Sequence, residues 1–358
     1  MTKKTWRVAM IGAGGIVQWG HIPAFQKLEN VEIVAVCDVN GERAKSVAAE
    51  AGIPGVYTDY KEMLAEVKPD LAVVATPNVF HKPMTLAALE AGCHVLCEKP
   101  LAITYADALE VVERAEALGK VLTVGTHYRW SGAMQAAKHQ VDAGFFGEIY
   151  AVRTVYSRRS GIPGYGSWFT NKDLAGGGSL FDIGVHGLDK ALFLMGYPKP
   201  VTVTGVTYAK FGPLGKGLGG WGIDKQKPTP GARYDVDDLA LAFVRFENGA
   251  TLQLQAAWAS NMPDDQSVEL FGTEGGARIS GASDFQLFTE VNDAPVNMVQ
   301  PVPQDKTGSN AKQISDLIQY LDGDLNAPLV TGRQILVGVQ ILDAIYKSAA
   351  NGREVVLG

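Results

Sequence analysis

The sequence predicts an α/β protein of two domains: a doubly wound parallel sheet, followed by an α+β domain with a mostly antiparallel, open-faced sheet. Short β-branched strands alternate with helical segments from residue 6 to about 126, which is typical of βαβ units. Beyond residue 144 the strands become longer, and several are joined by hairpin turns. The 358 residues are enough for two or three domains. We therefore expect domains over 1–126 and 127–358.

The first domain is expected to contain short strands separated by helices. The expected strands are residues 7–11, 31–37, 56–57, 71–75, 94–97 and 121–124, and the expected helices are 41–51, 60–67, 82–91 and 105–118. Three of these helices end at a glycine that can cap a helix C-terminus, namely Gly52, Gly92 and Gly119. Because parallel strands need crossover connections, this pattern predicts a parallel sheet with helices on both faces.

The second domain is expected to begin with a helix at 131–143. The expected strands are 149–156, 201–208, 239–246, 251–258, 267–271 and 277–280, and the turn Glu247-Asn248-Gly249 predicts one hairpin. Two further helices, at 310–321 and 332–350, either cover one face of this sheet or pack back on the first domain. Residues 212–231 are rich in Gly and Pro without periodicity, which indicates a lid, an oligomer-contact arm or a plain disordered loop.

Composition excludes several classes of partner. The chain has 32 Lys and Arg against 38 Asp and Glu, with no long basic run, so we expect no nucleic-acid and no membrane partner. No export signal or run of about 18 apolar residues is visible, which predicts a soluble cytoplasmic protein. The odd set Cys37, Cys93 and Cys97 lies in or beside apolar runs, which favours reduced, buried thiols over disulfides or a metal site. A small-molecule partner is the default.

A glycine-rich turn follows the first expected strand. Gly12, Gly14, Gly15 and Ile16 lie where a dinucleotide-binding turn must lie, with backbone N–H groups able to approach a pyrophosphate at a helix N-terminus. Val17 stands where the third glycine of this pattern is usual, and that glycine serves helix packing. The alternative is a glycine-rich turn without a ligand.

Asp38 ends the second expected strand, roughly 20 residues after this turn, as a ribose-binding acid would. A carboxylate there repels a 2′-phosphate, so NAD is favoured over NADP, although Arg43 keeps NADP open. Alone, Asp38 would be a solvated turn residue.

A further loop, Thr76, Pro77 and Asn78, follows the strand at 71–75, and ligands lie at the carboxyl ends of strands in such sheets. We therefore expect all three residues to contact the cofactor. His81 shares this loop and is either a cofactor neighbour or a helix-start residue.

Residues 91–100, with the sequence AGCHVLCEKP, resemble the A-G-K-H-V-x-x-E-K-P motif of the Gfo/Idh/MocA oxidoreductases, the glucose-fructose oxidoreductase and inositol dehydrogenase family. Further similarities are the HIPA run at 21–24 and GGGSLFDIGVHGLD at 176–189, so that the resemblance spans nearly the whole chain. It implies an N-terminal Rossmann domain that binds NAD through Glu98 and Lys99 as well, and a substrate domain whose sheet forms a homo-oligomer. The chain departs from the family pattern at Cys93, at Val17 and at 127–130.

The expected chemistry is removal of hydride from a secondary alcohol, which needs a base for the hydroxyl proton and a cation near the developing alkoxide. Asp182 and His186 are four residues apart, on one face if the segment is helical, with Ser179 as a plausible cap. The resemblance implies that His186 is the general acid/base, that Lys99 polarises the reacting oxygen and that Asp182 binds substrate. A His–Asp capping pair is the structural alternative.

The substrate is expected to be a carbohydrate or glycoside. The candidates for the substrate wall are Tyr128, Arg129, Tyr156, Arg159 and Trp168. The alternative is that these residues are core or oligomer contacts, as aromatic residues in strands often are. An NAD-dependent sugar, cyclitol or glycoside dehydrogenase is the leading hypothesis. A lyase or glycosidase that retains its NAD and a non-catalytic nucleotide sensor are the alternatives.

Overall fold

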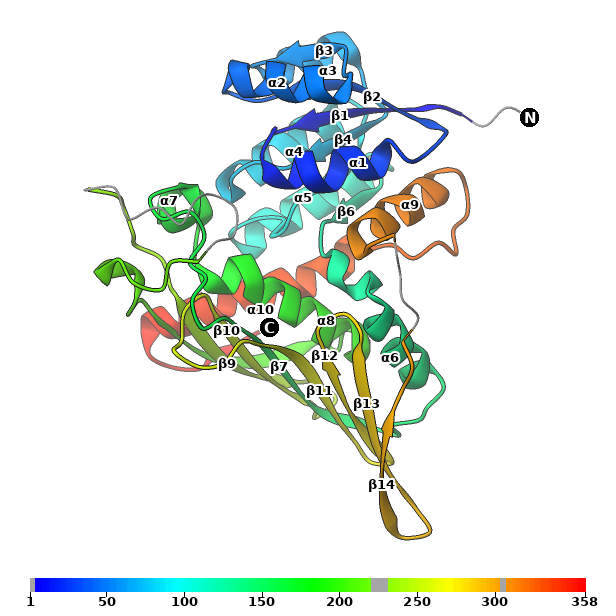
Figure 1. The fold of residues 1–358 in the computed structure, drawn as a ribbon, viewed down its shortest axis with the longest axis vertical. Helices are drawn as coiled ribbons and strands as arrows, with labels where there is room; N and C mark the ends of the chain where they lie inside the picture. Colours follow the sequence, from blue (N-terminus) through cyan, green and yellow to red (C-terminus); the bar gives the residue numbers. More distant parts are fainter. Residues whose placement is uncertain (1–3, 220–230, 303–306) are drawn as a thin grey trace. The chain divides into compact units, whose positions relative to one another are not determined.

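The computed structural model describes residues 4–219, 231–302 and 307–358, which form two compact units (Figure 1). Unit 1 is Met1–His127 with Thr307–Leu336, and unit 2 is Tyr128–Lys306 with Val337–Gly358. Unit 1 ends at His127, next to the boundary predicted near 126, and it also includes residues 307–336. The reason is the apolar stripe of the helix Ser309–Leu321 (α9), whose Ile314, Leu317 and Ile318 are buried in the same core as Val8 and Met10. Part of the loop predicted at 212–231 lies outside the described residues.

Unit 1 has the predicted parallel sheet. Its order is β3-β2-β1-β4-β5-β6, with every pair parallel. The strands are β1 (Trp6–Ile11), β2 (Val31–Cys37), β3 (Gly55–Tyr57), β4 (Leu71–Val74), β5 (His94–Cys97) and β6 (Leu122–Val124). The order reverses between β1 and β4, which places the ligand crevice of a doubly wound sheet at the carboxyl ends of these two strands.

Local capping signals mark the ends of some helices of unit 1. The helices of this unit are α1 (Ile22–Phe25), α2 (Gly41–Ala51), α3 (Tyr60–Val67), α4 (His81–Glu90), α5 (Tyr105–Ala117) and α9. Asn40 and Thr104 cap α2 and α5, because each side chain accepts a hydrogen bond from a backbone N–H of the first turn. Gly52 ends α2 in the left-handed conformation.

Unit 2 is built on a nine-stranded sheet in the order β14-β13-β12-β11-β7-β10-β9-β8-β15. Its pairs are antiparallel except β7 with β10, which confirms the predicted mostly antiparallel sheet. The strands are β7 (Ile149–Ser157), β8 (Pro200–Tyr208), β9 (Leu239–Phe246), β10 (Thr251–Ala257), β11 (Asp265–Gly272), β12 (Gly275–Ser280), β13 (Asp284–Val291), β14 (Ala294–Val299) and β15 (Val355–Val356). The sequence did not predict β13, β14 or β15, and β14 is almost wholly exposed, so it lacks a buried apolar face to reveal it.

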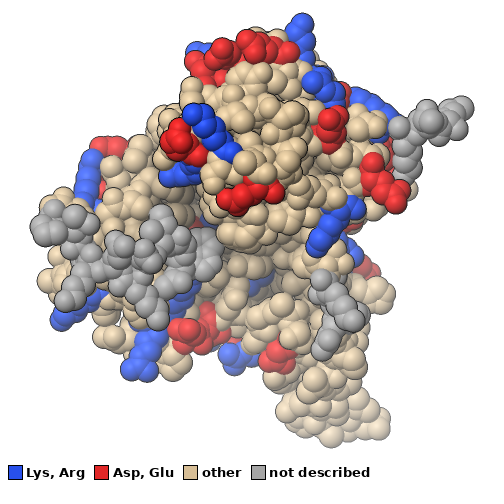
Figure 2. All heavy atoms as spheres, turned by 45° about the horizontal axis from the view of Figure 1, so that its top comes forward, with Lys and Arg blue, Asp and Glu red and all other residues tan. Residues whose placement is uncertain are grey.

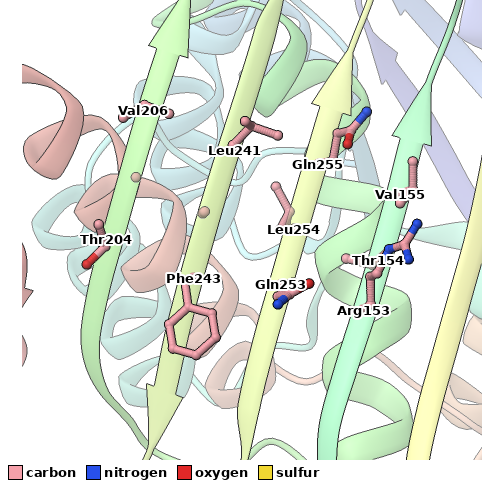
Figure 3. A pocket seen from close by; sticks show the side chains of 12 residues that line it. Arg153, Thr154, Val155, Thr204, Val206, Leu241, Phe243, Gln253, Leu254 and Gln255 are labelled. Atoms are coloured by element: carbon pink, nitrogen blue, oxygen red, sulfur yellow. The ribbon is translucent and has the colours of Figure 1, made fainter. Parts of the chain in front are cut away.

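Helices cover one face of this sheet. They are α6 (Gly132–Asp142), α8 (Val185–Met195) and α10 (Gly332–Asn351), which starts in the stretch assigned to unit 1, and the short α7 (Lys172–Ala175) also belongs to unit 2. The Thr154 hydroxyl of β7 donates to the Gly187 carbonyl of α8, and the Gly205 N–H of β8 donates to Ser348 of α10. The opposite face of β7, β8, β9 and β10 carries Arg153, Val206, Leu241, Phe243, Gln253 and Gln255 (Figure 3).

The distribution of surface charge and the state of the cysteines are as the sequence predicts. On the face drawn in Figure 2, acidic and basic side chains are interspersed, and neither sign forms a continuous field. Cys37, Cys93 and Cys97 are buried free thiols, as predicted. Within the described ranges, no helix has both the length and the apolar character needed to cross a membrane.

Candidate active site

The glycine turn after β1 has the geometry of a dinucleotide-binding turn. Gly12 has φ +108°, and a Cβ there would lie 2.2 Å from the Ala75 carbonyl oxygen, so only glycine fits. The space beside Gly14 is open: among the described residues, apart from Gly14 and its two chain neighbours, no atom lies within 4 Å of the position of a Cβ. Val17 is fully buried in the core of unit 1, so the missing third glycine alters packing alone. The turn therefore leaves room for a phosphate group.

Asp38 holds this turn from the end of β2. One carboxylate oxygen accepts a hydrogen bond from the Ala13 N–H at 2.9 Å, and the other accepts from the Asn40 N–H at 2.8 Å. Arg43 Nη1 lies 3.6 Å from the same carboxylate. Each carboxylate oxygen has more than one lone pair, so the group can anchor the turn and still accept from a ribose hydroxyl.

The loop after β4 lies at the same edge of the sheet. Thr76 Oγ1 is buried, and within the described residues it has no hydrogen-bond partner, which a bound ligand could supply. Asn78 is buried and begins a 3₁₀ turn directly after Pro77. With the open space beside Gly14, this orphaned hydroxyl shows that the residues present fit a dinucleotide.

His81 occupies the helix-start position, which is one of the two alternatives predicted for it. It begins α4 and is buried, with Nδ1 2.6 Å from the Pro100 carbonyl oxygen and Nε2 2.8 Å from the Thr76 carbonyl oxygen. Burial lowers the pKa of His81. Both ring nitrogens thus contact backbone carbonyls, so the ring ties the loop after β4 to the loop after β5.

Glu98, which is predicted to bind the cofactor, holds protein groups in this structure. Its Oε1 lies 2.9 Å from His21 Nε2, and its Oε2 accepts from the Lys99 N–H at 3.2 Å. Although burial opposes ionisation, the hydrogen bond with His21 and the nearby Lys99 lower the pKa of Glu98 to about 2. Together with His81, which holds the Pro100 carbonyl, Glu98 fixes the backbone on both sides of Lys99.

The lowered pKa of Glu98 makes unit 1 sensitive to acid. A carboxylate with a depressed folded-state pKa contributes stability above its unfolded pKa, and this contribution is lost as pH falls through the folded pKa. We expect the unfolding free energy to drop between about pH 5 and pH 2 and Glu98→Gln to be less stable at pH 7 with a flatter acid limb. Urea unfolding at a series of pH values measures both, and an unchanged acid limb in the variant would contradict the assignment.

The GGGS run of unit 2 is fastened to Asp237. A Cβ on Gly178 would lie 1.9 Å from the Asp237 carbonyl oxygen, so a glycine is required there. The Asp237 carboxylate accepts from the Gly178 N–H, the Leu180 N–H, the Ser179 hydroxyl and the Tyr346 hydroxyl, at 2.7–3.1 Å. We predicted that the Ser179 side chain caps the following helix. It does not, because its hydroxyl donates to Asp237 instead.

Asp182 and His186 follow this anchored run. Asp182 lies in the π-helical turn Leu180–Gly184, and His186 is the second residue of α8. Both side chains are buried, at 8% and 6% exposure. The wider π turn replaces the α-helical turn expected from their spacing.

An aromatic wall adjoins His186. The Tyr128 ring packs edge-on against the imidazole with centroids 4.6 Å apart, and Tyr156 lies 6.3 Å from Tyr128. Burial raises the pKa of Tyr128, as do Tyr156 and, to a lesser extent, Asp182. The structure thus brings together Tyr128, Tyr156, Asp182 and His186.

Two residues of this cluster were missed by the sequence analysis. Arg158 lies over the Tyr156 ring at 5.4 Å, and the Trp258 indole donates to Asp182 Oδ2 at 2.8 Å. The alternation of β7 could have found Arg158, because it follows Tyr156 by two residues and so continues the same face. No local signal pairs Trp258 with Asp182.

Three predicted substrate residues have other environments. Arg129 is buried and binds Asp189 through two nitrogens, with Phe193 and Tyr197 packed around its guanidinium, so it is an internal ion pair. Arg159 is exposed, and its backbone N–H donates to Asp264. Trp168 stacks on Phe169 with ring centroids 3.8 Å apart. The position of a residue near a strand or loop of the site does not show whether its side chain faces the site.

Comparison with known protein families agrees with both units. Residues 6–126 match the profile of an oxidoreductase family with an NAD-binding Rossmann fold, and residues 134–278 match the GFO/IDH/MocA C-terminal domain. The chain belongs to the Gfo/Idh/MocA family. As a member of this family it is an oxidoreductase with an NAD-binding domain, as the motif at 91–100 predicted.

Curated relatives extend over the whole chain. D-glucoside 3-dehydrogenase of Escherichia coli (strain K12) is 36% identical, covering 100% of this chain and 99% of the relative. A putative UDP-kanosamine synthase oxidoreductase subunit of Amycolatopsis mediterranei is 31% identical, covering 97% of each. Among solved structures, an aldose-aldose oxidoreductase of Caulobacter crescentus complexed with glycerol is 26% identical, with a TM-score of 0.80 over 99% of this chain and 100% of that one.

Proposed function

We propose that this family member is a dehydrogenase that oxidises a secondary ring hydroxyl of a sugar, cyclitol or glycoside to the ketone. The observation that carries the proposal is the buried Asp182 and His186 pair beside Tyr128, on a run that Asp237 fastens, in a chain with the NAD-binding fold. NAD, when bound, supplies the hydride acceptor. The relative named D-glucoside 3-dehydrogenase supports D-glucosides as the first substrates to test.

Each residue has a role that follows from its chemistry. His186 takes the hydroxyl proton, because an imidazole exchanges protons near neutral pH. Lys99 supplies a positive charge to stabilise the oxygen as it becomes an alkoxide, and its backbone is held on both sides by Glu98 and His81. Asp182 accepts hydrogen bonds from substrate hydroxyls. The Tyr128 and Tyr156 rings exclude water and offer a platform for a sugar ring.

The test of this function is a two-step assay. Mass spectrometry of nucleotide released from the purified protein identifies the cofactor, and a panel of polyols and glycosides is then screened for NADH formation. We expect NAD and a steady NADH increase with a glucoside. Bond cleavage without net NADH would instead support the NAD-retaining lyase or glycosidase, whereas a nucleotide sensor has no need of Lys99, Asp182 and His186 together.

Asp38→Ala is expected to weaken NAD binding by roughly 1.5–3 kcal/mol, which is about 10- to 150-fold in Kd. Loss of the ribose contacts and of the Ala13 N–H bond are the causes, and the preference for NAD over NADP should narrow. Calorimetry measures both affinities. The matched control is Asp59→Ala, which removes the cap of α3 and should leave NAD affinity unchanged. Equal affinity of Asp38→Ala and the unmodified protein would exclude the ribose role.

We also propose that the open face of the unit 2 sheet binds a second copy of the chain. Val206, Leu241 and Phe243 leave apolar surface on β8 and β9 (Figure 3). Arg153 and Arg278 flank Glu269 across β7, β11 and β12, so a copy of this row that is offset by one strand would oppose Arg to Glu. Sedimentation should show that the unmodified chain is a multimer. Leu241→Glu should lower the fraction of multimer, and Val39→Glu on unit 1 should leave it unchanged. A monomeric unmodified chain would contradict the proposal.

A further inference from the structure

Trp258 is a buried residue whose polar atom contacts the candidate site. It follows β10, is fully buried, and donates from its indole Nε1 to Asp182 Oδ2 at 2.8 Å. Its own backbone N–H donates to the Asp238 carbonyl at 2.8 Å, which holds the main chain from which the indole side chain extends. We propose that Trp258 is a positioning residue that orients the Asp182 carboxylate toward the substrate hydroxyls, an inference that rests on the proposed function.

The chemistry of the indole suits this role. Its nitrogen is a donor only, so it can hold an ionised carboxylate oxygen and cannot compete with it as an acceptor. A carboxylate is planar, so fixing Oδ2 also fixes the direction of Oδ1. A large buried ring has few accessible rotamers, which keeps this direction constant.

The rest of the anchorage limits how Asp182 can move. The turn that carries Asp182 is bound to Asp237 through the Gly178 and Leu180 N–H groups, and the Ser179 hydroxyl also lies 3.3 Å from the Ala256 carbonyl oxygen of β10. Strand β10 thus holds the backbone before Asp182, and Trp258 holds its side chain. Asp182 acts electrostatically on Tyr128, whose ring lies against His186, so its orientation bears on the same cluster.

The test is a double-mutant cycle between Trp258 and Asp182. Trp258→Phe should lower kcat/KM for a glucoside by about 10-fold or more, the effect of losing a hydrogen bond to a charged group, with NAD affinity unchanged within about twofold. In the Asp182→Asn background, Trp258→Phe should add little further loss, because its partner is already altered. Trp6→Phe is the matched control: it removes an indole hydrogen bond of 2.8 Å to Asp322 in unit 1 and should leave kcat/KM unchanged.

A second measurement does not require a folded Trp258 variant. The chain has 6 tryptophans, and each gives one indole signal in a ¹⁵N NMR spectrum. Asp182→Asn should shift the Trp258 signal, and saturating glucoside should shift the same signal in the unmodified protein. A glucoside that is bound but leaves this signal unmoved would overturn the role of Trp258.

The outcomes separate the two proposals. An unmodified protein that oxidises glucosides, with equal losses from Trp258→Phe in both backgrounds, overturns the positioning role alone. A protein that neither oxidises nor binds any glycoside overturns the proposed function, and the positioning role with it.

Discussion

Replacing Lys99 with methionine is expected to reduce turnover at least about a hundredfold, the low end of what a positioned acid, base or charge contributes. Methionine keeps the length of the side chain and removes the charge that we propose stabilises the developing alkoxide. The backbone contacts of residue 99 with Glu98 do not involve the side chain, so the loop and NAD binding should persist. Steady-state rates with a glucoside, together with NAD titration, measure both effects.

The matched control is Lys45→Met, on the exposed surface of α2, which should leave turnover unchanged. Lys99→Arg retains a positive charge on a different shape and should recover part of the rate. Turnover of Lys99→Met close to that of the unmodified protein would assign the lysine to a structural role.

Replacing His186 with asparagine should remove the neutral-pH ionisation from the turnover profile while preserving the fold and NAD binding. Histidine is the side chain that ordinarily changes charge between pH 5 and 8. Oxidation needs a neutral base, so turnover of the unmodified protein should rise with pH through this range and then level off. In the variant, the rising limb should disappear and the rate should fall about a hundredfold or more.

The pH profile of the variant identifies the group that produces the limb, because another base in the site would give a similar limb in the unmodified protein. His139→Asn, an exposed histidine of α6, is the control and should retain the limb. If His186→Asn keeps both the limb and most of the rate, proton transfer runs through Lys99 or water, and the histidine only binds substrate.

The parts of the structure that local chemistry determines could be predicted. Helix α2 has the predicted bounds because Asn40 caps its start and Gly52 ends it. The position of Asp38 at the end of β2, beside the glycine turn, could be predicted because it depends on one βαβ unit. Ser179, by contrast, was predicted as a cap, and its partner Asp237 lies 58 residues further along the chain. No local pattern reveals such a pairing.

The same reason explains the substrate residues. Arg129 is of a residue type that often contacts substrates. Its partner Asp189, however, is 60 residues away in sequence, and their ion pair is largely buried. Trp258 and Asp182 are 76 residues apart, so their contact depends on how β10 lies against the turn after Gly178. Tyr128 and Tyr156 were predicted only as candidates for a substrate wall, and the contact of Tyr128 with His186, 58 residues further along the chain, was not predicted.

The return of α9 to the first unit has a consequence for biosynthesis. A ribosome completes all six strands of the nucleotide-binding sheet by residue 124, but the side chains of Ile314, Leu317 and Ile318 that fill its core are made almost 200 residues later. Tyr346, which binds Asp237, arrives later still. The nascent first unit must therefore remain with part of its apolar core uncovered while the second unit is translated. Both halves of the enzyme become complete only when the final helices leave the ribosome.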